Sequence, residues 1–384
     1  MTATRPAEAE ATLTRERVTA WRLRRHHLVE RAPASAMLDV VADLAGLHAQ
    51  VMSSAELTLW ARVDGLDPDA VRRALWDDRT LVKTWAMRGT LHLLPARDYP
   101  RWQAALSTYK HYLKPGWFRG FGITRDEFKQ LMDAVRAALE GRELTRAELA
   151  AQVAERTGLA ELGAKLNDSW GAYLKPASFR GHLIFAPGDG QKVRFTRPDT
   201  WLAEWRDEDP EEAELSVARA FLTASGPVTR EDFGRWWAIS PAAAERLCKR
   251  LGEEAVRVEV DGTAAWALRA HVGDIATAAP ASTVRLLPAF DQYVITATRH
   301  VTELLPGPFA DRVYRPQGWL SPVLLVDGRM DGIWRSEVKG RTISVEIEPF
   351  TKLSAATRDA AEAEAERLAA WKDRTLDLRW LPVA

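Results

Sequence analysis

One local pattern occurs three times along this chain: helical segments followed by a hairpin of two short strands. In the last copy, Asp261-Gly262 joins two apolar runs, and Asp-Gly is a strong hairpin signal because its residues accept a positive φ. In the middle copy, Gly188-Asp189-Gly190 joins the runs 182–186 and 192–196. Helices that lead into a hairpin are typical of a winged helix, a variant of the helix-turn-helix. The repetition therefore predicts three winged helices in tandem.

Three of the predicted helices share a start signal. In each, a threonine stands three residues before an acid, and an apolar stripe at helical spacing follows. A threonine N-cap accepts a hydrogen bond from a first-turn amide, and an acid at the N3 position bonds back to the N-cap amide. The three pairs are Thr124 and Glu127, Thr145 and Glu148, and Thr229 and Asp232.

The first copy has helical segments around 14–31, 36–46, 53–62 and 68–78. Its hairpin is expected to consist of Leu81–Trp85 and Thr90–Leu94, with the turn at Arg88-Gly89 because glycine tolerates a positive φ. On such a wing, Arg88 and Thr90 are candidates for contacts with DNA phosphates or groove edges. The alternative for Arg88 is an exposed turn residue without a ligand.

Short strands replace helices from about Ser282 onward. Apolar runs between glycine turns predict strands at 284–288, 323–326, 330–334 and 342–347, and a final helix is expected at 355–372. We predict a small β-barrel or curled sheet that this helix closes, which makes the fold class α+β. The predicted domains are a first winged helix at 12–118, a second at 119–209, a third at 210–275, and the β-barrel with its closing helix at 276–384.

The charge of the chain gives no support to nucleic-acid binding. The 384 residues include 53 Lys and Arg and 53 Asp and Glu, so the formal net charge is zero. A basic groove can still be offset by acidic outer helices. Basic residues crowd one early helix between Arg15 and Arg31, where they form either a solvated face or a DNA-binding face.

Several kinds of site and location are disfavoured. Cys248 is the only cysteine, which excludes a disulfide framework and a cysteine-based metal site. The histidines lack metal-ligand spacing, and the chain has no glycine-rich phosphate loop or serine elbow, so we expect no metal and no cofactor. No apolar run has the length of a membrane span, and the N-terminus lacks a signal-peptide core. We therefore expect a cytoplasmic protein that associates with the nucleoid through DNA and not with membranes.

Five sequence blocks, in their order and spacing, resemble one family. They are Leu47-His48-Ala49-Gln50, Trp85–Leu94, Phe185–Gly188, Leu286–Asp291 and Val323–Arg329. The chain resembles the bacterial winged-helix DNA glycosylases of the AlkZ/YcaQ-like, azinomycin-resistance type. That family has a glutamine-apolar-glutamine or glutamine-apolar-aspartate catalytic motif upstream of such a wing, and this chain has a His-Ala-Gln variant with His48 in the first position. The resemblance implies three tandem winged helices and a β-barrel, arranged as a C-shaped clamp.

The resemblance also implies a reaction, hydrolysis of the N-glycosidic bond of an N7-alkylated purine in double-stranded DNA. Alkylation at N7 makes the base cationic, so the leaving group needs no protonation. His48 and Gln50 would position the attacking water, and neutral His48 would add general-base character. This requires a loop or distorted turn at 47–52, because residues two apart diverge on a regular helix. The alternative is that both side chains cap the preceding helix.

The expected substrates are bulky N7-alkylguanine adducts or interstrand crosslinks, in DNA repair or in self-resistance to a genotoxin. We expect a monofunctional glycosylase, because the lysine nearest to His48 in the sequence is Lys83 on the wing strand, where it is not placed for a Schiff base. We also expect a monomer. Asp291 is expected to bind DNA or to hold the catalytic segment, with a purely structural turn as the alternative. The alternative function is a non-catalytic DNA-binding protein, either a damage binder or a transcription regulator.

Overall fold

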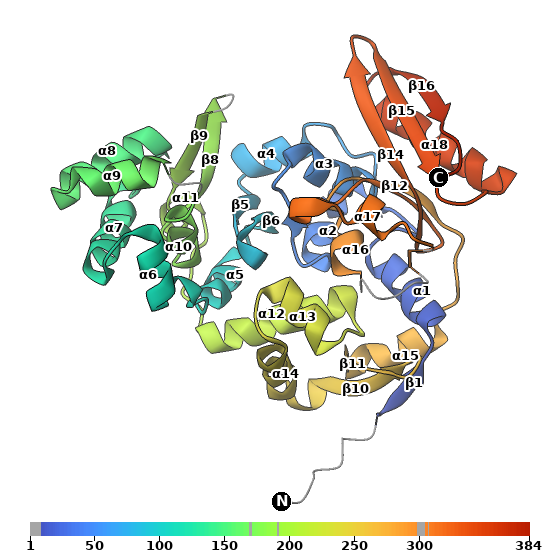
Figure 1. Ribbon diagram of the computed structural model, residues 1–384, viewed down its shortest axis with the longest axis horizontal. Coiled ribbons are helices and arrows are strands. Elements are labelled where there is room, and N and C mark those ends of the chain that lie inside the picture. Colours follow the sequence, from blue (N-terminus) through green and yellow to red (C-terminus); the bar gives the residue numbers. More distant parts are fainter. Residues whose placement is uncertain (1–8, 169–170, 190–191, 298–303, 306) are drawn as a thin grey trace, which may run out of the picture. The chain divides into compact units, whose positions relative to one another are not determined.

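The computed structural model describes residues 9–168, 171–189, 192–297, 304–305 and 307–384 (Figure 1). The chain divides into two compact units. Unit 1 comprises Met1–Ala70 and Arg219–Ala384, and unit 2 is the continuous segment Val71–Ala218. Both units combine helices with small sheets, so the fold is a mixed α+β fold.

The strands of unit 2 form the first two predicted hairpins. They are β5 (Leu81–Trp85), β6 (Leu91–Pro95), β7 (Leu144–Thr145), β8 (Ile184–Asp189) and β9 (Lys192–Thr196). β5 pairs antiparallel with β6, and β8 pairs antiparallel with β9. β7 adds to the other edge of β9, which gives the order β7-β9-β8. Both hairpins are present, but β8 begins at Ile184 and continues through Gly188 and Asp189 of the predicted turn, whose third residue, Gly190, lies outside the described residues.

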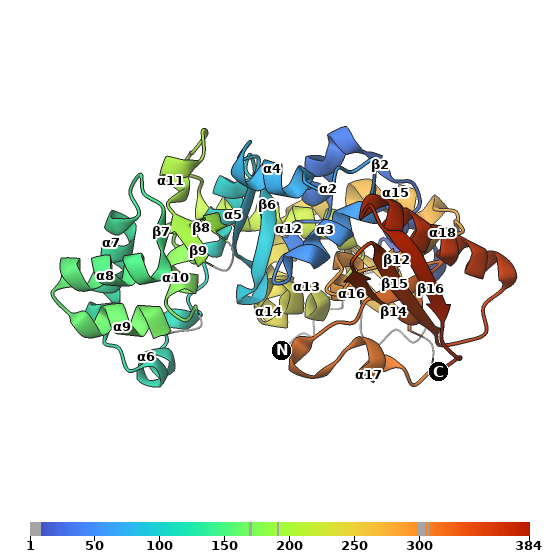
Figure 2. The ribbon, with the colours of Figure 1, turned by 90° about the horizontal axis from the view of Figure 1, so that it is seen from above.

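The helical elements between Ala70 and Ala218 are α4 (Ala70–Trp76), η2 (Met87–Gly89), α5 (Tyr99–Leu106), η3 (His111–Leu113), α6 (Pro115–Phe121), α7 (Arg125–Ala138), α8 (Arg146–Thr157), α9 (Ala160–Asp168), α10 (Leu174–Phe179) and α11 (Pro198–Trp201), and α12 (Pro210–Ser225) begins there. The capping boxes predicted at Thr124 and Thr145 are present at the starts of α7 and α8. α8 packs against both α7 and α9, and α8 and α9 lie side by side in both views (Figures 1 and 2).

The third predicted hairpin lies in unit 1 and consists of β10 (Ala255–Val260) and β11 (Thr263–Leu268). Its turn residues, Asp261 and Gly262, have φ values of 44° and 79°, as an Asp-Gly turn requires. A third strand comes from the start of the chain, because β1 (Ala11–Leu13) pairs parallel with β10. α1 (Arg15–Arg25) and α15 (Arg269–Thr277) pack against each other beside this sheet. Their shared core contains Leu13, Val18, Val256, Val258, Val260, Ala265, Ala267 and Ile275.

The C-terminal strands form one sheet in the order β12-β13-β14-β15-β16. They are β12 (Val284–Leu287), β13 (Val323–Val326), β14 (Arg329–Lys339), β15 (Thr342–Pro349) and β16 (Thr375–Trp380). β16 pairs parallel with β15 after the crossover helix α18 (Ala355–Trp371), which packs against β12 and β16 (Figure 1). These edge strands do not pair with each other, so no closed β-barrel is found among the described residues. The predicted barrel is an open sheet here, because the chain returns through a helix and no strand joins the two edges.

The remaining elements of unit 1 are β2 (Ala32–Pro33), η1 (Ala34–Ala36), α2 (Met37–Asp43), β3 (Leu47–His48), α3 (Met52–Trp60), β4 (Val63–Asp64), α13 (Arg230–Trp237), α14 (Pro241–Arg250), η4 (Gly252–Glu254), α16 (Gln292–Thr296), α17 (Ala310–Val313) and η5 (Pro316–Gly318). The predicted capping box at Thr229 begins α13. Within the described ranges, no helix has the length and apolar character needed to cross a membrane.

Candidate active site

The predicted catalytic motif lies between α2 and α3 in unit 1. After α2, Ala45 and Gly46 take left-handed conformations with φ of 54° and 89°, and the Gly46 amide bonds back to the last turn of α2. The chain then enters β3, which carries His48. Val51 is extended, with φ of −115°, and α3 begins at Met52. The motif is therefore non-helical, as the sequence predicts.

The imidazole of His48 is almost buried and stacks on a second aromatic ring. His48 is 7% exposed. The centroid of its ring lies 4.8 Å from that of the Phe290 ring, with 25° between the two ring planes. Phe290 in turn meets Trp319 edge-on, with centroids 4.9 Å apart. Because Trp319 is 47% exposed, the three rings lead from the interior to the surface. This packing fixes the plane of the imidazole.

Gln50 differs from His48 in its surroundings. It lies in the bend after β3 and is exposed, whereas Ala49 between the two residues is fully buried. The motif therefore presents one polar side chain held against the core and a second at the solvent boundary. A water molecule that contacts both would be oriented by a rigid group and shielded on one side.

Asp291 forms a buried ion pair with Arg62, the residue that follows the C-terminal end of α3 by two positions. The two guanidinium nitrogens lie 2.7 and 2.8 Å from the two carboxylate oxygens, and both side chains are 0% exposed. Asp291 also caps α16 by accepting a hydrogen bond from the Tyr293 amide at 2.9 Å. The prediction of a direct DNA contact does not fit, because a fully buried carboxylate has no surface to offer. The second predicted role, holding the catalytic segment, does fit these contacts.

The segment 290–293 is attached to the motif at two points. Phe290 stacks on His48, and the Gln292 side-chain amide donates to the Gly46 carbonyl oxygen. Phe290 has φ of 58°, a conformation that large side chains rarely adopt. The neighbouring ion pair and the α16 cap hold the backbone in this conformation. The segment is thus a rigid support for the imidazole.

The far end of α3 is held by the C-terminal helix α18. Arg367 Nη2 donates to the carbonyl oxygens of Trp60 and Val63, at 2.7 and 2.8 Å. Trp371 Nε1 donates to the Leu66 carbonyl oxygen at 2.9 Å. Burial is the largest of the effects that lower the pKa of Arg367 to about 10. Since the motif lies directly before α3, these bonds contribute to its position.

Arg88 and Thr90 lie in unit 2, in the loop between β5 and β6. Arg88 and Gly89 have φ of 58° and 67°, which confirms the predicted turn, although the second strand begins at Leu91. The Thr90 hydroxyl donates to the Met87 carbonyl oxygen at 3.0 Å. Both Arg88 and Thr90 remain partly exposed, as a DNA contact requires.

The basic residues of α1 and the turn after it are largely engaged inside unit 1. Arg22 and His26 are buried, and their side chains bond to carbonyl oxygens at the end of α12 and just beyond it. Arg25 and His27 share the carboxylate of Asp43, at 3.2 and 2.8 Å. These contacts favour a structural role over the alternative of a DNA-binding face.

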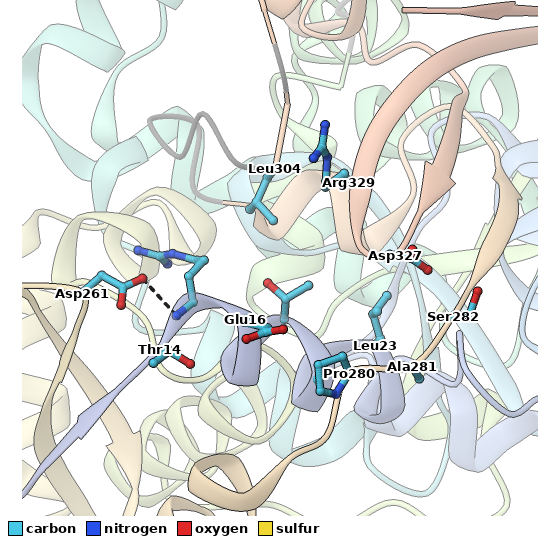
Figure 3. Close-up of a pocket in the computed structure, with 13 residues that line it drawn as sticks. Thr14, Glu16, Leu23, Asp261, Pro280, Ala281, Ser282, Leu304, Asp327 and Arg329 are labelled. Carbon is cyan, nitrogen blue, oxygen red and sulfur yellow. Dashed lines mark hydrogen bonds between the residues drawn. The ribbon is translucent and has the colours of Figure 1, made fainter. Parts of the chain in front are cut away.

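A hollow of about 640 Å³ opens beside α1, but it contains none of the predicted site residues (Figure 3). Its lining carries both signs of charge, with Arg15 and Arg329 beside Glu16, Asp261 and Asp327. The Arg15 amide donates to the Asp261 carboxylate at 3.0 Å. In the part of the chain that the structure describes, no group of three or more His, Cys, Asp or Glu residues could hold a metal ion.

Sequence reasoning missed Phe290, Arg62 and Trp319 as parts of the site. Phe290 stands in one of the blocks that carry the family resemblance, but an aromatic residue in an apolar run usually belongs to the core. Arg62 gave no local signal, because its partner lies 229 residues further along the chain.

Comparisons with known proteins agree with this architecture. The sequence matches the family described as DNA glycosylase AlkZ-like over residues 41–371. A curated relative from Streptomyces sahachiroi, an interstrand DNA cross-link repair glycosylase, is 36% identical over 357 residues, which is 92% of this chain and 95% of the relative. The solved structure of Streptomyces sahachiroi DNA glycosylase AlkZ matches with a TM-score of 0.87 and 34% identity, over 96% of this chain and 100% of that chain. The chain belongs to the AlkZ-like DNA glycosylase family, which confirms the predicted enzyme class, a hydrolase of N-glycosyl bonds.

Proposed function

We propose that this enzyme hydrolyses the N-glycosidic bond of bulky N7-alkylguanine adducts in double-stranded DNA, including adducts within interstrand crosslinks. The observation that carries the proposal is the fixed imidazole of His48 in a non-helical segment that also carries the exposed Gln50 two residues later. The name of the Streptomyces sahachiroi relative supports crosslinked DNA as a substrate. The biological role is DNA repair or self-resistance to a genotoxin.

The proposed mechanism places one water molecule between His48 and Gln50. The N7-alkylated base leaves as a neutral molecule, so the enzyme has to orient the water and stabilise the positive charge that develops on the sugar. Neutral His48 accepts a proton from the water as it attacks, and the Gln50 carbonyl oxygen orients it. Phe290 and the buried Arg62–Asp291 pair act as positioning residues for the imidazole.

The enzyme is proposed to be monofunctional because water is the nucleophile, and to need no metal or cofactor because the base is already cationic and leaves without further activation. It acts as a monomer in the cytoplasm, associated with the nucleoid through its substrate. Three winged helices, at about 12–118, 119–209 and 210–275, bind duplex DNA together with the C-terminal region, as a clamp. Arg88 and Thr90 of the first wing contact the DNA backbone or groove edges, and a backbone contact positions the duplex without selecting a sequence.

The test measures base release from duplex DNA that carries a single N7-alkylguanine, with enzyme in excess, as the number of abasic sites formed. His48→Ala and Gln50→Ala should each lower the single-turnover rate by about 100-fold or more, with little change in DNA affinity. His48→Gln should recover part of the rate, because the amide orients water but accepts no proton. Since both residues act on one water, the losses in the double variant should be less than additive.

Gln152→Ala is the matched control, because Gln152 is a partly exposed glutamine on α8 whose side chain bonds to the exposed residues Arg142 and Glu155. It should leave the rate unchanged. If His48→Ala and Gln50→Ala release the base at the wild-type rate, the catalytic assignment fails. If wild-type enzyme binds the adduct and forms no abasic site, the protein is a damage binder.

A further inference from the structure

Unit 2 contains a second hollow of about 640 Å³, whose lining differs in chemistry from the first. We call it the aromatic pocket and define it by Trp117, Phe121, Tyr173, His111, Lys165 and Lys175. These residues come from η3, α6, α9, α10 and the residue directly before α10. The volume falls within the range of about 300–1,000 Å³ that is usual for small-molecule sites.

Three aromatic rings form one wall of the aromatic pocket. The Trp117 centroid lies 4.6 Å from that of Phe121 and 6.0 Å from that of Tyr173. Tyr173 is buried, and its hydroxyl donates to the Phe121 carbonyl oxygen at 2.9 Å. Phe121 is 41% exposed, although exposure of a large apolar ring to water is energetically unfavourable. The wall is therefore a preformed apolar platform with an open face.

Apart from the tyrosines, the polar side chains that line the aromatic pocket are basic. Lys165, Lys175 and His111 line the pocket, and among its described lining residues there is no carboxylate. The nearby Glu127 is engaged in the α7 capping box, where it accepts the Thr124 amide at 2.7 Å. Burial lowers the pKa of Lys175, and burial followed by Lys114 and Lys175 lowers the pKa of His111. Burial disfavours the charged form of Lys175, and an anion in the pocket would stabilise that form.

We propose that the aromatic pocket binds one unstacked nucleotide of DNA, with the base on Trp117 and Phe121 and the phosphate at Lys165 and Lys175. A planar ring attached to an anion is the chemistry that this lining selects, and aromatic platforms hold unstacked bases in this way. Bases inside a duplex have both faces covered, so the ligand is a nucleotide that is already displaced, as happens where an enzyme opens DNA to act on a base. This inference rests on the proposed function only in taking DNA as the ligand.

The experiment compares two fluorescently labelled duplexes by anisotropy, one fully paired and one with a central loop of unpaired nucleotides. Wild-type protein should bind the looped duplex about tenfold more tightly. Phe121→Leu keeps the apolar bulk but removes the ring, and it should abolish this preference. Phe121→Tyr keeps the ring and should retain it. Lys165→Ala should weaken binding of the looped duplex, whereas Lys129→Ala should not, because Lys129 is an exposed lysine paired with Asp133 on α7.

Equal thermal midpoints for wild type and Phe121→Leu would exclude a folding defect in the variant. Retention of the preference by both Phe121→Leu and Lys165→Ala would overturn the proposal. Free deoxynucleoside monophosphate that competes as well as the looped duplex would also overturn it, because the ligand would then be a free nucleotide. The result is separate from the catalytic proposal, since binding is measured on undamaged DNA and His48→Ala should leave the preference intact.

Discussion

Replacing Arg62 by methionine tests whether the buried ion pair supports the active site. The substitution preserves much of the side-chain length but leaves the Asp291 carboxylate without its partner, in a position where both side chains are 0% exposed. We expect the free energy of unfolding to fall by about 3–5 kcal/mol, the usual cost of leaving a buried charge uncompensated. Water cannot screen the charge at this site, so no discount for exposure applies.

A second replacement separates the charge from the shape of the site. Arg62→Met combined with Asp291→Asn removes both charges, while the asparagine can still cap α16 by accepting the Tyr293 amide. The double variant should recover most of the lost stability. It should still release the base more slowly than wild type, because the segment that carries Phe290 is held less firmly behind His48.

The assay is denaturant unfolding followed by tryptophan emission, paired with the single-turnover rate of base release. Lys129→Ala is the control, because it breaks an ion pair whose side chains are 76% and 62% exposed and should cost no more than about 0.5 kcal/mol. If Arg62→Met loses less than about 1 kcal/mol, the reasoning about this pair is refuted. If the double variant is stable and fully active, the pair has no positioning role.

Three further predictions concern solution conditions. Burial holds the pKa of His26 well below its ordinary value, so His26 stays neutral in the folded protein, while the unfolded chain takes up a proton below about pH 6.5. The free energy of unfolding should therefore fall as the pH drops from 7 to 5, by up to about 1.4 kcal/mol per pH unit. His26→Gln should flatten this pH dependence in unfolding curves. Base release should persist in EDTA, and a loss that added divalent ions restore would contradict a metal-free mechanism. Affinity for undamaged duplex should fall steeply with salt despite the zero net charge, and a flat salt titration would argue against phosphate contacts.

The features that could be predicted from the sequence are those with local signals. The three capping boxes depend on residues three positions apart, and the Asp261-Gly262 turn depends on two adjacent residues, so each was visible without the fold. The family blocks likewise placed the motif at His48 and Gln50.

The features that could not be predicted depend on distant parts of the chain. The bond between Arg62 and Asp291 spans 229 residues, and β1 is too short to show a period that would identify its partner β10. The C-terminal sheet would close into a barrel only if its edge strands β12 and β16 paired, and hydrophobic patterning does not specify which strands pair. β16, in contrast, does carry a local signal, because Thr375–Trp380 alternates polar and apolar residues.

The split sequence of unit 1 determines an order of events during synthesis. Arg15 and Asp261, which bond beside the β1–β10 pairing, are 246 residues apart. A ribosome that adds about 5–20 residues per second needs on the order of 10 to 50 seconds to pass from one to the other. All of Val71–Ala218 is made within that interval, so unit 2 can fold while β1 still has no strand to join. An unpaired strand of a nascent chain can pair with neighbouring chains, so a chaperone bound near the N-terminus during this interval should raise the yield of the whole enzyme more than that of unit 2.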